Sequence, residues 1–91
     1  MSATDTIQIM RNIIRDLRQT ELQNARLAGE LSQEEVRTAA ALNQNIGNVA
    51  ELAAKDRRLA GALHDFADAG THAAQQLAQL ETMLDQLGNR F

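Results

Sequence analysis

The chain has 91 residues, a formal net charge of -3, a pI near 5.2 and neither Cys nor Pro. This length suits one small domain, residues 1–91, and the absence of Cys excludes disulfides and thiolate metal sites. The negative charge disfavours general binding to nucleic acid or anionic membranes. With abundant Ala, Leu, Gln, Glu and Arg, the composition predicts an all-α fold with coiled-coil-like packing.

The first predicted helix covers about residues 6–28. Ser2, Thr4 or Asp5 could cap its start, because each has a side-chain oxygen that accepts from free backbone N–H groups. Apolar residues then recur on one side of the helix at a spacing of about three and four residues. These residues are Ile7, Met10, Ile13, Ile14 and Leu17.

A basic stripe follows another side of the same helix. Its members share a band of the surface on a helix that advances about 100° per residue. The stripe consists of Arg11, Arg15, Arg18, Leu22 and Arg26. Two interpretations stay open: a solvated face paired with Asp16 and Glu21, or a docking strip for an acidic partner or phosphates, anchored by Leu22.

A turn is predicted between residues 28 and 33. Gly29 suits the left-handed residue that ends a helix, and Ser32 with Glu35 has the spacing of a capping box. Leu31 and Val36 have the spacing of a hydrophobic staple. We therefore expect a second helix over residues 33–69, antiparallel to the first because the connection is short.

The second predicted helix carries a seven-residue pattern, typical of helices that pack along a seam. One column contains Ala39, Ile46, Ala53, Ala60 and Ala67, and its partner column contains Leu42, Val49, Asp56 and Leu63. A third apolar column contains Leu52, Leu59 and Phe66. Small residues beside the seam, which include Gly47 and Gly61, would allow close helix approach.

Asp56 is the polar interruption of this pattern. As an N-cap it could start a new helix at Arg57, and the chain would then form a four-helix bundle. Without that break, the chain is an antiparallel hairpin extended to a three-helix bundle. The third helix is predicted over residues 72–87, after a stop at Gly70 and a cap at Thr71. Its apolar line is Leu77, Leu80, Leu84, Leu87 and the terminal Phe91.

Residues that could carry chemistry are few. His64, Asp68 and His72 would line up as metal ligands only if one helix ran through Gly70, so we expect no metal site and no cofactor. The chain has no nucleophile elbow and no Gly-rich phosphate loop, and its carboxylates are scattered. We expect neither an enzyme nor a small-molecule binder.

The sequence favours a non-enzymatic helical interaction module that self-associates or binds a partner helix, as a small adaptor, chaperone-like or assembly subunit. A dimeric nucleic-acid regulator using the Arg stripe, or an amphipathic membrane-surface helix, are the alternatives. We expect a cytoplasmic protein without a transmembrane segment. The predicted partner-binding residues are Leu42, Ile46, Val49, Leu52, Leu59, Leu63, Phe66, Leu77, Leu80, Leu84 and Leu87.

Overall fold

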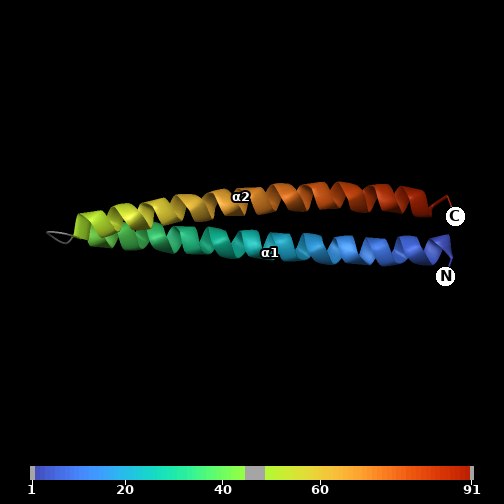
Figure 1. Ribbon diagram of the computed structural model, residues 1–91, viewed down its shortest axis with the longest axis horizontal. Helices are drawn as coiled ribbons and strands as arrows, with labels where there is room; N and C mark the ends of the chain where they lie inside the picture. The colour runs from blue at the N-terminus through green and yellow to red at the C-terminus, as the bar shows by residue number, and fades with distance from the viewer. Residues whose placement is uncertain (1, 45–48, 91) are drawn as a thin grey trace. The chain divides into compact units, whose positions relative to one another are not determined.

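The computed structural model describes residues 2–44 and 49–90. It contains two long helices, α1 (Ala3–Asn43) and α2 (Val49–Gly88), which pack as an antiparallel hairpin (Figure 1). The predicted all-α class and the hairpin are therefore confirmed. The predicted three helices over about 6–28, 33–69 and 72–87 are not what the chain forms.

Helix α1 starts with a capping box at Ser2 and Asp5. The Ser2 hydroxyl accepts a hydrogen bond from the Asp5 backbone N–H at 3.2 Å, and the Asp5 carboxylate accepts from the Ser2 backbone N–H at 3.3 Å. This reciprocal pair satisfies N–H groups that have no partner inside the helix. Both residues were among the predicted caps.

The predicted turn between residues 28 and 33 is wrong, because α1 runs through it without a break. Gly29 lies inside the helix, where a glycine costs only about 0.5 to 1 kcal/mol relative to Ala. The Ser32 hydroxyl does not cap a helix. It donates to the backbone carbonyl of Ala60 in α2, at 2.8 Å. Ser32 and Glu35, which have the spacing of a capping box, instead both face the second helix.

Helix α2 also runs through both points where a break was considered. Asp56 and Gly70 lie inside it, so neither the four-helix alternative nor a separate third helix is formed. Asp56 is half-buried and Gly70 is buried. Both belong to the column of Val49 and Leu63, which alternates with that of Ala53 and Ala60, and this unbroken phase keeps one side of α2 against α1.

The predicted helix over residues 33–69 is divided between α1 and α2. Helix α1 ends at Asn43, the Gln44 N–H bonds to the Ala41 carbonyl in a turn, and α2 begins at Val49. The sequence from 43 to 48 holds three Asn residues and a Gly, a composition typical of turns. The predicted column members Ile46 and Gly47 lie outside the described residues, as does Phe91.

Two compact units divide the chain. The terminal unit comprises Met1–Gln23 and Gly70–Phe91, and the central unit comprises Asn24–Ala69. Each contains a segment of α1 packed against a segment of α2. In both units the facing residues are buried or half-buried and follow each other at alternating spacings of four and three residues, as in a coiled coil. We call these facing residues the seam.

The seam differs in chemistry between the units. In the central unit it is small and partly acidic, with Ala25, Ala28, Ser32, Glu35, Ala39 and Leu42 from α1 and Val49, Ala53, Asp56, Ala60, Leu63 and Ala67 from α2. In the terminal unit it mixes Ile and Leu with charges, with Ile7, Arg11, Ile14, Arg18 and Glu21 from α1 and Gly70, Ala74, Leu77, Glu81, Leu84 and Gly88 from α2. Small seam residues allow close approach of the two backbones, but they bury little apolar surface.

Candidate partner-binding face

The two helices bury few large side chains between them. Six of the eight buried hydrophobic residues among the described positions are Ala, and the others are Ile7 and Leu84. No large side chain of the described residues is fully buried. Burying an Ala side chain removes far less apolar surface from water than burying a Leu. The hairpin therefore forms only a thin core of its own.

Most of the large apolar residues lie beside the seam and are exposed. Eleven of them directly precede a seam residue in the sequence. Because the helices are antiparallel and both right-handed, residues that precede a seam residue lie, within each unit, on the same side of the pair. We call this side the open face. In the terminal unit it consists of Met10, Ile13, Leu17, Leu80, Met83 and Leu87, and in the central unit of Leu27, Leu31, Leu52, Leu59 and Phe66.

A groove marks the open face in the central unit. Leu27 and Leu31 of α1 line it together with Leu63 and Phe66 of α2, and Asn24 and Ala28 complete its lining. The exposed fraction rises from 4% at Ala60, in the seam, to 47% at Leu59 and 57% at Phe66. Neighbouring residues of one helix thus divide sharply between a packed side and an apolar side that faces water.

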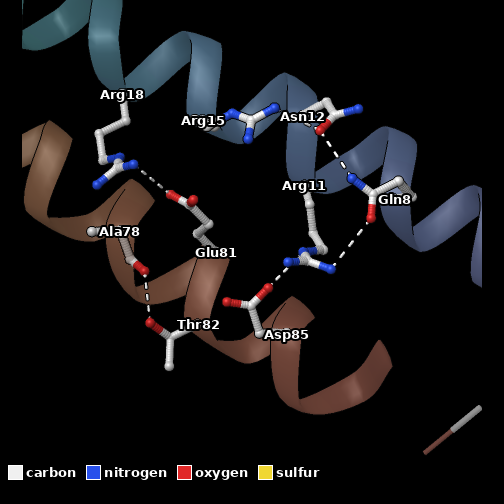
Figure 2. A network of polar contacts seen from close by, with 9 residues as sticks. All are labelled: Gln8, Arg11, Asn12, Arg15, Arg18, Ala78, Glu81, Thr82 and Asp85. Atoms are coloured by element: carbon white, nitrogen blue, oxygen red, sulfur yellow. Dashed lines mark hydrogen bonds and ion pairs between the residues drawn. The ribbon is translucent and has the colours of Figure 1, made fainter. Parts of the chain in front are cut away.

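Ion pairs hold the helices together in the terminal unit (Figure 2). Arg11 of α1 pairs with Asp85 of α2 at 2.5 Å, and Arg18 pairs with Glu81 at 3.1 Å. These side chains are only partly exposed, and Gln8 accepts a further hydrogen bond from Arg11 at 3.3 Å. Charged residues in a seam specify which positions face each other, because another register would leave a charge unpaired in the interface.

The predicted docking stripe is divided by these contacts. The guanidinium groups of Arg11 and Arg18 are engaged with α2 carboxylates, and Arg15 donates to the Asn12 side chain at 2.8 Å (Figure 2). Leu22 and Arg26 are exposed. Leu22 lines a groove with Arg18 and residues of α2 in the terminal unit. Docking of an acidic partner on this stripe stays a prediction.

The predicted partner-binding residues fall into two groups. Leu84 is buried and Leu42, Val49, Leu63 and Leu77 are half-buried in the seam, where they contribute to the hairpin itself. Ile46 lies outside the described residues. The exposed group on the open face is Leu52, Leu59, Phe66, Leu80 and Leu87.

Sequence reasoning missed the α1 half of the open face. Met10, Ile13 and Leu17 were placed on the apolar side of the first helix and Leu31 in the predicted turn, and Leu27 was given no role, yet all five are exposed. The sequence did contain the pattern of this face. Many positions one residue before the seam are also apolar, and they too recur at spacings of three and four residues. Only the pairing of α1 with α2 shows which set is buried.

Two carboxylates meet across the central seam. A hydrogen bond joins the side chains of Glu35 and Asp56. Desolvation raises the pKa of Glu35 above its ordinary value of 4.5, and the hydrogen bond and like charge of Asp56 raise it further, with a smaller contribution from Glu34. The pair opposes the packing of the two helices when both groups are ionised.

The histidine residues form no cluster of metal ligands with the other described residues. The helix does run through Gly70, as alignment of His64, Asp68 and His72 requires. His64 pairs with Asp68 at 3.4 Å, whereas the His72 ring lies 3.4 Å from the Gln76 amide.

Comparison with protein-family models, curated proteins and solved structures gives no match to this chain. Neither helix, over its described residues, has a stretch long and apolar enough to cross a membrane. The open face and the charges around it are therefore the basis for any functional inference.

Proposed function

We propose that the protein is a non-enzymatic helical interaction module, and that its open face binds other helices. One observation carries the proposal: large apolar side chains lie exposed on one side of the helix pair in each unit, six in the terminal unit and five in the central unit. Monomeric soluble proteins rarely expose extended apolar patches, and those that do so commonly use them for binding. Helices bind helices through such rows, because side chains at three- and four-residue spacing interdigitate.

The composition of the seam supports the same proposal. A chain that needed only to fold as a monomer would place its Leu, Met and Phe side chains between its helices. Here the small residues take that place, and Leu59 and Phe66 face water beside Ala60 and Ala67. Covering a half-exposed Leu or Phe with a partner helix stabilises the assembly by about 1 kcal/mol per side chain.

The test replaces Leu59 and Phe66 together by Gln. Light scattering measures mass across protein concentration, and an apolar fluorescent dye reports exposed apolar surface. The unmodified protein is expected to associate or to bind the dye, and the variant should do neither to the same extent. Arg57 and His64, both exposed and also seven residues apart, provide a matched control when replaced by Gln. Identical behaviour of all three proteins would contradict the proposal.

A further inference from the structure

We infer that a second copy of this chain covers the open face of the central unit, with α1 of one copy lying over α2 of the other. The inference rests on the proposed function, because it names the partner of the same face. Two arguments lead to it: the amount of surface left exposed, and the charges at the two edges of the face.

The exposed surface is large enough for a stable dimer. The chain has an accessible surface of 6583 Å² at a mass of 10.0 kDa. A typical folded monomer of this mass exposes about 5,200 Å². The excess of roughly 1,300 Å² is spread over all sides of both units and includes the exposed apolar side chains of the central open face. A standard interface buries approximately 800 Å² of each partner. A second copy supplies an apolar face of the same size and kind.

Opposite charges lie at the two edges of the face. Glu34 follows Leu27 by seven residues on the α1 edge, and Lys55 lies between Leu52 and Leu59 on the α2 edge. Both are exposed, and their ion pairs with Arg37 and Glu51 lie within single helices at the surface. Such exposed pairs contribute little and exchange easily.

The register places these charges at nearly the same height along the hairpin. The hydrogen bond from Ser32 to Ala60 fixes the register of the two helices in the central unit. Residues of α1 and α2 whose numbers add up to 92 lie at the same level along the pair. Glu34 is then level with Arg58, and Lys55 lies three residues from that level, within one helical turn. A twofold axis parallel to the helices brings Glu34 of each copy to Lys55 of the other.

The opposite orientation is disfavoured by the same charges. With the twofold axis across the helices, α1 would lie on α1 and α2 on α2. Glu34 lies seven residues from both Leu27 and Ala41, and an axis at this level would bring the two Glu34 carboxylates together. Like charges placed face to face in an interface oppose association. The arrangement with α1 over α2 instead brings Glu34 of each copy near Lys55 of the other, and we infer this arrangement for that reason.

Exchange of the two charges tests this arrangement. Sedimentation equilibrium measures the dimer dissociation constant of Glu34→Lys and of Lys55→Glu alone, of their equimolar mixture and of the double variant. Each single variant places like charges at both contacts, so its dissociation constant should rise about tenfold. The mixture and the double variant restore opposite charges at both contacts and should recover the original value.

The control is Arg57→Glu, which makes the same charge change at an exposed position that follows the seam residue Asp56 and therefore lies on the side of the pair opposite the open face. It should leave the dissociation constant unchanged, and circular dichroism verifies that every variant is helical. A mixture that associates no better than its components overturns the inference. An unmodified protein that stays monomeric also overturns the inference of a second copy. If such a monomer binds the dye and loses this binding when Leu59 and Phe66 are replaced, the proposed function is still supported. Dye binding that these replacements leave unaltered would contradict both the inference and the proposed function.

Discussion

Replacing Gly29 by Ala distinguishes a continuous α1 from the turn that the local sequence indicates. Gly29 lies within α1, and a Cβ built on it meets no atom within 4 Å. Ala in a helix interior is favoured over Gly by about 0.5 to 1 kcal/mol. If Gly29 instead ended a helix in the left-handed conformation, Ala would be strained there and would destabilise the protein by a similar or larger amount. The two structures therefore predict opposite signs.

Thermal unfolding followed by circular dichroism at a fixed protein concentration measures this difference. The expected stabilisation corresponds to a rise in midpoint of about 2 to 8 °C for a chain of this size. Gly61→Ala is the matched control, because Gly61 lies inside α2 and a Cβ there also meets nothing within 4 Å. A lower midpoint for Gly29→Ala together with a higher one for Gly61→Ala would refute the continuous helix.

Two further substitutions test the central seam. Because the folded-state pKa of Glu35 is raised, its contribution to stability is fully present below the ordinary value of 4.5 and is lost as pH rises through the folded-state pKa. Glu35→Gln should therefore raise the free energy of unfolding at pH 7 relative to the unmodified chain, and this gain should vanish in acid; a gain that does not depend on pH would contradict the repulsion from Asp56. Ser32→Ala removes the hydrogen bond to the Ala60 carbonyl and should cost about 0.5 to 1.5 kcal/mol in denaturant unfolding, whereas no loss would show that the contact adds nothing.

Local sequence signals predicted the class of the fold but not the number of helices. Gly29, Ser32 and Glu35 have the spacing of a helix end and a new start, yet these signals are each worth only about 1 kcal/mol. Packing of the two helices along a continuous seam outweighs them. Helix α1 ends at Asn43 and α2 begins at Val49, within a stretch that the heptad pattern assigned to one helix because Ile46 kept the pattern in phase.

The seam of α2 was predictable, because Ala53, Ala60 and Leu63 recur every seven residues or at the matching offset. The composition of the α1 seam was not. Apolar periodicity assigns Met10 and Leu17 to the core, whereas the structure places Arg11 and Arg18 there, each paired with a carboxylate of α2. Such a choice depends on a partner about 60 to 75 residues away in the sequence, which single-helix patterns do not report.

Labelling of a single introduced thiol most directly tests whether a second copy covers the open face. The chain has no Cys, so Leu59→Cys and Arg57→Cys each create one reactive site, on the open face and on the opposite side of the pair respectively. Alkylation of Cys at position 59 should slow as the protein concentration rises through the dimer dissociation constant, while alkylation at position 57 stays constant. Equal rates at position 59 over the whole concentration range would contradict burial of this face by a second copy.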